Sequence, residues 1–193
     1  IVKKYNELVE KTKKIKEGDD EDENSIVESD YISDVNFEDI GGLDHIIKDI
    51  QDFSHHAKNP IVYQHLGLDP SYSILMHGPP GTGKTMIAQA IANELDYELL
   101  EINSSNLRNQ DAMKTFLNSA LGQQSLFFKP KLILIDEIDN VSGVKDRGAV
   151  QALTKAIEKS SFPVILTAND PFNSKLKALK KVSQMIEFHK LQY

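Results

Sequence analysis

The segment HGPPGTGKT at residues 77–85 restricts the fold of this chain more than any other feature. Residues 78–85 fit the pattern GxxxxGK[ST] in full. The preceding SILMH at 73–77 is short and apolar, as in a buried strand, and TMIAQAIANEL at 85–95 has apolar residues on one helical face. A glycine-rich loop between a strand and a helix turns its backbone N–H groups toward an anion, and the helix N-terminus adds its positive dipole end. The segment therefore predicts a phosphate-binding loop in an α/β fold.

Two polar side chains of this loop have the chemistry that nucleotide binding needs. We expect Lys84 to reach the β- and γ-phosphates and the Thr85 hydroxyl to bind Mg²⁺. The loop's glycines let its backbone approach the phosphates closely. The residues expected to contact the nucleotide here are Gly78, Pro79, Pro80, Gly81, Thr82, Gly83, Lys84, Thr85 and Met86.

A second apolar run, LILID at residues 132–136, ends in two consecutive carboxylates. Such a run is typical of a buried parallel strand, and ligands of open α/β sheets bind at the carboxyl ends of the strands. Asp136 is therefore expected to hold Mg²⁺, and Glu137 is expected to be the base that polarises the attacking water. Read alone, IDEID could equally be an acidic cluster at a strand end. Asp139 is assigned no catalytic role.

Asn169 ends a further apolar strand, VILTAND. Its amide could orient water against a γ-phosphate, or Asn169 could simply form the turn before Asp170 and Pro171. Strands are also expected at 97–103 and 184–188, and a helix at 146–160. Alternating strands and helices with apolar strands indicate a three-layer α/β fold with a parallel sheet.

Composition excludes several kinds of protein. The chain has no cysteine, so it has no disulfide and no cysteine metal site. It also contains no run of about 18 apolar residues of the kind that spans a membrane. The net charge of −7 is uneven, because residues 17–39 contain eleven acidic residues and no basic one. Residues 40–193 are neutral overall, which neither excludes nor supports a nucleic-acid partner.

The first 35 residues differ from the remainder. Apolar or nearly apolar residues in 1–16 alternate at spacings of four and three, which fits a short surface helix, a frayed tail or a brief coiled coil. The acidic stretch at 18–30 is expected to be a solvated linker. We therefore predict an N-terminal helix and flexible acidic linker at 1–35, followed by one domain at 36–193.

The motifs GPPGTGKT, LILIDEID and LTAND stand in the order and spacing of the AAA+ ATPases, and residues 36–189 resemble that family. The resemblance implies ATP and Mg²⁺ as ligands and a three-layer αβα P-loop NTPase fold. Its parallel sheet would have five strands in the order 5-1-4-3-2. The family's helical lid would begin near residue 190, so we expect a core without a lid or its sensor 2 arginine, and reduced affinity and turnover. By the same resemblance, the Walker A pair is Lys84 and Thr85, the Walker B pair is Asp136 and Glu137, and sensor 1 is Asn169.

Two branches of the family are represented. Residues 35–53 and 59–85 resemble AAA proteins of the valosin-containing-protein group, in which the segment matching IGG lies against the adenine. Ile40 and Gly41 are therefore expected to contact the base, although a glycine pair can also form a plain turn. From about residue 99 onward the chain is similar to the large subunit of archaeal replication factor C, a sliding-clamp loader, and this likeness includes the unusual SGVKDRG turn.

Departures from each branch restrict the function. SSNLRNQDAMKTF at 104–116 is polar where threading ATPases have an aromatic pore loop. No arginine follows Arg147, whereas threading ATPases have two arginines after sensor 1 that reach a neighbour's site. Clamp-loader small subunits have Ser-Arg-Cys before the last strand, and Lys181, Val182 and Ser183 stand at the matching place. The missing arginine resembles the large subunit.

The leading interpretation is therefore an ATPase core of the clamp-loader large-subunit type, acting in DNA replication and weak in isolation. It would work in a ring or arc with other AAA+ subunits, one of which supplies an arginine finger, and with a sliding clamp and primed DNA. Lys114, Lys145 and Arg147 are weak candidates for contacts to the DNA backbone. The resemblance implies an intracellular protein, cytoplasmic in a prokaryote and nuclear in a eukaryote. The alternatives are a remodeller of protein or ribonucleoprotein complexes and a nucleotide-dependent scaffold, and the presence of Glu137 argues against the scaffold.

Overall fold

The computed structural model describes residues 35–37, 40–67, 72–103, 130–140, 147–170 and 172–190. The predicted helix and linker at 1–35 thus lie outside these residues, apart from Val35. The described strands are β1 (Ser73–His77), β2 (Glu98–Asn103), β3 (Lys131–Asp136), β4 (Val164–Ala168) and β5 (Gln184–Glu187). The described helices are α2 (Asp44–Lys58), α3 (Pro60–His65), α4 (Lys84–Leu95), α6 (Arg147–Glu158) and α7 (Leu179–Val182), with 3₁₀ turns η3 (Ile138–Asn140) and η5 (Ser174–Lys177).

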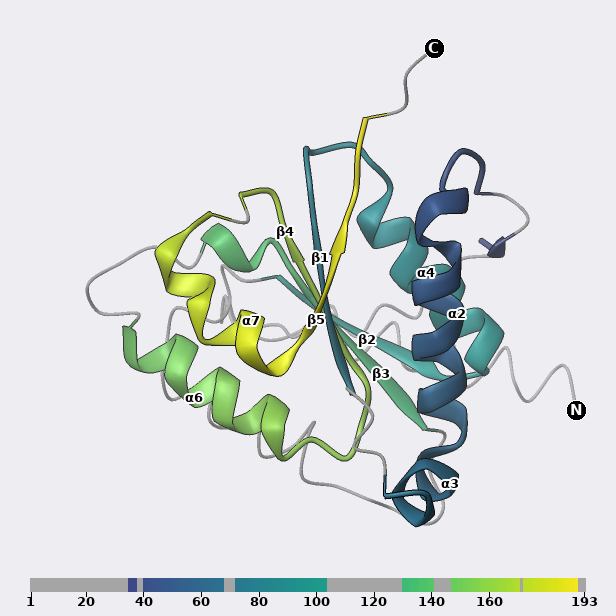
Figure 1. The fold of residues 1–193 in the computed structure, drawn as a ribbon. Coiled ribbons are helices and arrows are strands. Elements are labelled where there is room, and N and C mark those ends of the chain that lie inside the picture. Colours follow the sequence, from purple (N-terminus) through teal and green to yellow (C-terminus); the bar gives the residue numbers. More distant parts are fainter. Residues whose placement is uncertain are drawn as a thin grey trace, which may run out of the picture.

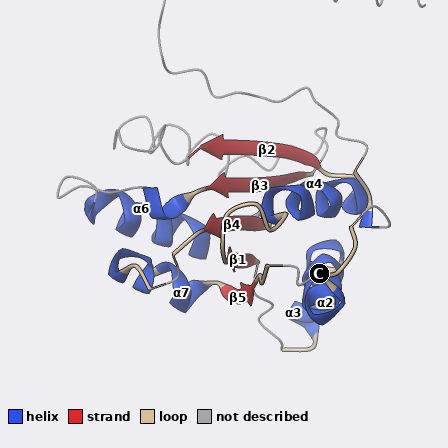
Figure 2. Cartoon of the chain, turned by 90° about the horizontal axis from the view of Figure 1, so that it is seen from above, coloured by secondary structure: helices blue, strands red, loops and turns tan. Residues whose placement is uncertain are grey.

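The five strands form one parallel sheet in the order β2-β3-β4-β1-β5, which is the predicted order written from the other edge. Figure 2 shows this order as a stack of strands with helices on both sides. β1 and β4 lie at the centre, where Leu75 pairs with Leu166 and His77 with Ala168. Parallel order brings the carboxyl ends of all strands to one edge, so the phosphate-binding loop, the acidic pair Asp136–Glu137 and Asn169 lie at that edge.

Burial explains why these segments form strands. Every residue of β1 and β4 is buried, and both strands are nearly continuous apolar runs, because helices cover both faces of a parallel sheet. The edge strand β2 alternates between exposed or partly buried positions and the buried Leu100 and Ile102. The predicted strand at 163–170 is two residues too long at its end, since the chain turns after Ala168.

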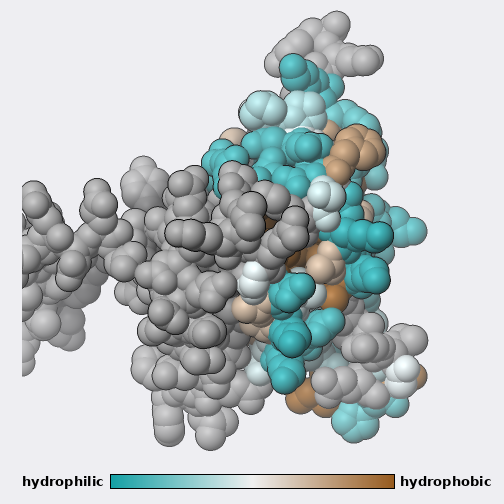
Figure 3. All heavy atoms as spheres, turned by 90° about the vertical axis from the view of Figure 1, so that its left-hand side faces the viewer, coloured by the Kyte–Doolittle hydropathy of each residue, from teal (hydrophilic) through white to brown (hydrophobic). Residues whose placement is uncertain are grey.

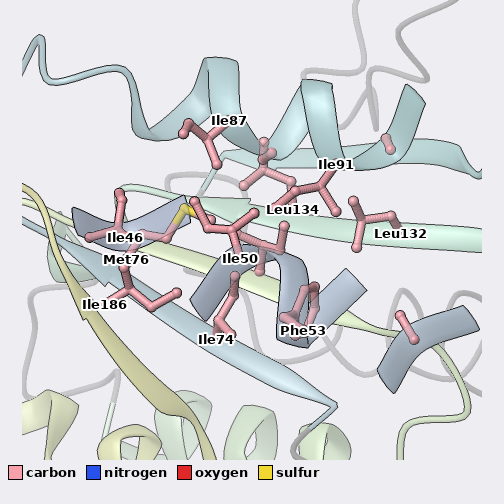
Figure 4. Close-up of a cluster of buried hydrophobic side chains, with 14 of the residues drawn as sticks. Ile46, Ile50, Phe53, Ile74, Met76, Ile87, Ile91, Leu132, Leu134 and Ile186 are labelled. Carbon is pink, nitrogen blue, oxygen red and sulfur yellow. The ribbon is translucent and has the colours of Figure 1, made fainter. Parts of the chain in front are cut away.

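The helices cover opposite faces of the sheet (Figures 1 and 2). On one face α2 and α4 bury Ile46, Ile50 and Phe53 against the sheet, as Figure 4 shows in close-up. On the other face α6 and α7 bury Leu153 and Leu179 among a second cluster. The structure thus confirms the three-layer α/β architecture.

The described residues on the side of α6 and α7 give a mostly polar surface. In Figure 3, which faces this side, the described residues are mostly hydrophilic. Lys155, Lys159 and Lys181 are exposed there. Within the part of the chain that the structure describes, no helix combines the length and apolar character needed to cross a bilayer.

Candidate active site

The loop between β1 and α4 departs from ordinary backbone geometry at its glycines. Gly78, Gly81 and Gly83 have φ values of 147°, 76° and 86°. At Gly78 the requirement is also steric, because a Cβ there would lie 2.2 Å from the backbone oxygen of Phe188. The N–H of Phe188 donates to the oxygen of His77 at 2.7 Å, so the residue after β5 lies directly beside the start of the loop. A Cβ on Gly81 or Gly83 would meet nothing within 4 Å, which leaves room for a ligand beside the loop.

The Lys84 side chain lies inside the loop. Its Nζ donates to the backbone oxygens of Gly78 at 2.8 Å and Pro79 at 2.9 Å, and to Oδ1 of Asn169 at 3.3 Å. The Thr82 hydroxyl donates to the oxygen of Pro79 at 2.9 Å and braces the same turn. The ammonium is thus held where backbone and side-chain oxygens converge, and phosphate oxygens could replace these acceptors.

The pKa of Lys84 reflects two opposing effects. Burial lowers the pKa of its ammonium below the ordinary lysine value, while Asp136, then Asp139 and Glu137, act to raise it. The predicted phosphate-binding lysine and the predicted Walker B pair are therefore close enough to interact electrostatically.

Thr85 and Asp136 supply a pair of oxygen ligands. The Thr85 hydroxyl lies 3.4 Å from each carboxylate oxygen of Asp136, although the two residues are 51 positions apart in the chain. Mg²⁺ prefers oxygen ligands and is commonly held by one or two protein groups together with nucleotide phosphates. The donor set thus fits Mg²⁺ bound with a nucleotide.

Glu137 adopts a backbone conformation that is rare for its residue type. Its φ is 53°, and its N–H donates to the Thr167 hydroxyl at 2.9 Å. Its Oε2 accepts a hydrogen bond from the Asn140 amide at 2.8 Å. Left-handed backbone costs a non-glycine residue on the order of 1–2 kcal/mol, so these contacts hold the side chain at a place it would not otherwise take.

The position of Asn169 is compatible with both roles considered from the sequence, namely orienting water and forming a turn. Its side chain faces the loop, since Oδ1 accepts a hydrogen bond from Lys84. Its backbone N–H and that of Asp170 both donate to Oδ2 of Asp139, at 2.9 and 3.0 Å, which forms a turn. The geometry therefore brings the Asn169 amide to the site, while its action on water stays a prediction. Asp139, for which the sequence predicts no catalytic role, fixes this turn.

The remaining predicted contacts lie around this centre. Ile40 is partly buried against the cluster lined by Ile87 and Ile91 of α4, so its segment lies on the same face of the sheet as α4. Gly41 is exposed, and Met86, in the first turn of α4, is 47% exposed. Pro80 is exposed beside the open side of the loop. Arg108, Lys114 and Lys145, the polar stretch at 104–116 and the Arg147 side chain lie outside the described residues.

Sequence reasoning missed two residues that contact the acidic pair. Thr167 bonds to both members of the pair, because its hydroxyl also donates to Oδ1 of Asp136. Asn140 contacts Glu137 alone. The available signal for Thr167 was a hydroxyl residue inside the otherwise apolar run VILTA.

The sequence of this chain is similar to that of known proteins. The family model for the "ATPase family associated with various cellular activities (AAA)" matches residues 74–190. The chain is 48% identical over 119 residues to "Replication factor C large subunit" of Nanoarchaeum equitans, a match that covers 62% of this chain and 28% of the relative. Proteins of the same name match from Thermofilum pendens, at 44% over 118 residues, and from Sulfolobus acidocaldarius, at 45% over 120 residues. These matches cover 61–62% of this chain and 28–29% of each relative.

The chain thus spans less than a third of the length of these relatives. The family match begins at residue 74, so of the two stretches with a predicted likeness to the valosin-containing-protein group, residues 35–53 and 59–73 lie outside it. The matched stretch runs from the second residue of β1 through β5, and it contains the described residues of the site apart from Ile40 and Gly41. Since this match takes in more than half of the sequence, the chain belongs to the AAA family of ATPases.

Proposed function

We propose that this chain is the ATP-binding and ATP-hydrolysing core of a protein of the clamp-loader large-subunit type, acting in DNA replication. The observation that carries the proposal is the convergence of Lys84, Thr85, Asp136 and Asn169 at one edge of the sheet. The replication role is supported by the relatives, which are named replication factor C large subunit.

Each residue has a distinct task in this proposal. Lys84 binds the β- and γ-phosphates in place of the loop oxygens it now contacts, and Asn169 orients the attacking water. Thr85 and Asp136 hold the metal, which when bound neutralises charge on the phosphates. Glu137 accepts a proton from the water as it attacks. The backbone of residues 78–83 lines the phosphates, Ile40 and Gly41 contact the base, and Met86 is a further contact to the nucleotide.

Two substitutions test the nucleotide chemistry. Lys84→Ala should abolish binding of a fluorescent ATP analogue, while Lys155→Ala, which removes an exposed lysine of α6, should bind as the wild type does. Glu137→Gln should keep binding and lose about 10²–10⁴-fold in single-turnover hydrolysis, because it removes the base. Glu158→Gln is its matched control on α6. Wild-type affinity in Lys84→Ala, or a rate within about threefold of wild type in Glu137→Gln, contradicts the assignment.

The macromolecular partner requires a separate experiment. We propose that the chain assembles in an arc or ring with other AAA+ subunits inside the cell, and that this assembly contacts a sliding clamp and primed DNA. The second candidate is a remodeller of protein complexes, which the likeness of residues 35–53 to the valosin-containing-protein group favours. Retention of this chain on an immobilised sliding clamp supports the first function. Stimulation of its ATPase by an unfolded protein, with no retention on the clamp, supports the second.

A further inference from the structure

Thr167 occupies an unusual place in the sheet. It lies in the central strand β4, pairs with Met76 of β1, and is 1% exposed. A hydroxyl buried this deeply must find hydrogen-bond partners, because an unpaired polar group in such an environment costs roughly 1–3 kcal/mol. Both partners of the Thr167 hydroxyl belong to the acidic motif at the end of the neighbouring strand β3.

The two bonds use the hydroxyl in opposite senses. Its proton goes to Oδ1 of Asp136, and its oxygen accepts the backbone N–H of Glu137 at 2.9 Å. One oxygen atom thus fixes the carboxylate that faces Thr85 and also the peptide that begins the left-handed turn at Glu137. A hydroxyl can donate and accept at once, and a methyl group of the same size can do neither.

We propose that Thr167 is a positioning residue for both acids of the site, which aims Asp136 at the metal and holds the Glu137 backbone in its strained conformation. The inference rests on the proposed function, since it assigns Thr167 to the metal and the base named there. Partners that orient a metal ligand from behind typically contribute about 10–100-fold to metal affinity or activity.

The test separates the hydroxyl from the shape of the side chain. Thr167→Val keeps the shape and removes the hydroxyl, and Thr167→Ser keeps the hydroxyl. Thr154→Val is the matched control, because Thr154 is also buried and its hydroxyl bonds to the oxygen of Val150 inside α6, on an element that supplies no described site contact. Binding of a fluorescent ADP analogue to the full chain is measured against Mg²⁺ concentration, and single-turnover ATP hydrolysis is measured beside it.

We expect Thr167→Val to need about 10–100-fold more Mg²⁺ for half-maximal enhancement of binding. Its nucleotide affinity without Mg²⁺ should stay unchanged, since the loop and Lys84 are untouched. Hydrolysis should fall by a similar factor. Thr167→Ser and Thr154→Val should both stay close to the wild type. Thr167→Cys, with a weaker donor of similar size, should fall between Val and Ser, and it keeps the test decisive if the valine variant does not fold.

Three outcomes would overturn the inference without touching the proposed function. Thr167→Val could need no more Mg²⁺ than the wild type, or Thr167→Ser could lose as much Mg²⁺ affinity as Thr167→Val. If Thr167→Val does not fold, the third outcome is a wild-type Mg²⁺ requirement in Thr167→Cys. Failure of the wild-type chain to bind nucleotide at all would overturn the proposed function, and the inference with it. The two failures are therefore distinguishable in a single set of titrations.

Discussion

Replacing Gly78 by alanine should destabilise the fold far more than the same change three residues later. At Gly78 the new Cβ would lie 2.2 Å from the backbone oxygen of Phe188, and the φ of 147° disfavours any side chain. Neither atom can move easily, because Phe188 is buried and its N–H is bonded to the oxygen of His77. Gly81 is the matched control, because its φ is 76° and a Cβ added there would meet nothing within 4 Å.

The two costs follow from this geometry. Backbone strain at Gly78 is on the order of 1–3 kcal/mol, and forced overpacking adds typically another 1–3, so the total is about 4 kcal/mol. Gly81→Ala should cost only the strain of the left-handed backbone, a loss of about 1 kcal/mol in the free energy of unfolding. In a chain of this size each kcal/mol lowers Tm by about 2–4 °C, which gives falls of roughly 12 °C and 3 °C.

Thermal unfolding without nucleotide measures the difference, so a loss of ligand binding cannot contribute to it. Circular dichroism at one protein concentration is sufficient, with Gly83→Ala as a second control because its Cβ also meets nothing within 4 Å. Equal Tm values for Gly78→Ala and Gly81→Ala would refute the reasoning, since the close approach of Phe188 to Gly78 would then add nothing to the cost of the substitution.

Three further predictions concern other parts of the chain. Deleting residues 1–34 should leave Tm within about 5 °C, since their acidic run cannot bury enough apolar surface to order itself, and Val35, whose oxygen bonds to Asn93, is kept. Stability should fall as the pH drops below about 6.5, because burial holds the pKa of His77 below its ordinary value and the unfolded chain takes up the proton first. The fall in Tm between pH 7.5 and 5.5 should be smaller in His77→Gln, and an equal fall counts against the idea. ATPase activity of the chain alone should be low and independent of its concentration, and a partner with the Ser-Arg-Cys motif should raise it; strong self-activation would instead point to Arg147 or Arg108.

Much of the fold could be predicted because its signals are local. The loop at 77–85 and the apolar runs before Asp136 and Asn169 identified three central strands, and the family resemblance supplied their order. The α2 helix was not predicted separately, although apolar residues recur at helical spacing from Leu43 to Ala57. That spacing was visible, so this was an omission rather than a limit of the sequence.

Other features could not be predicted because they depend on contacts between distant segments. The need for glycine at position 78 arises from Phe188, which approaches only because β5 pairs with β1. Thr167 lies in a strand buried on both faces, so no alternation of polar and apolar residues indicates where its hydroxyl points. Its bonds to the acidic pair follow from the packing of β4 beside β3.

The described charges around the loop are mostly negative. Asp136, Asp139 and Glu137 all act on Lys84, and burial followed by Asp136 raises the pKa of Glu101 on the neighbouring strand. Among the described side chains linked by these electrostatic interactions, Lys84 is the one ammonium, and the others are carboxylates. A bound triphosphate would add more negative charge in a partly desolvated place, where repulsion is stronger than in water.

Several sources could supply positive charge beyond that of Lys84. The N-terminus of α4 contributes about half an elementary charge, and Mg²⁺ between Thr85 and Asp136 would contribute two. In related phosphoryl-transfer enzymes an arginine finger adds a further cation at the γ-phosphate, which is worth about 10³–10⁵-fold. Val182, which the resemblance to clamp loaders predicts to match that arginine, is partly buried against the core cluster of α6 and α7 and carries no charge. We therefore expect an adjacent subunit to supply the arginine finger for the site of this chain. We also expect this chain to supply no arginine to a neighbour through position 182. Such an arrangement suits a subunit at one end of an arc better than one within a closed ring of identical copies.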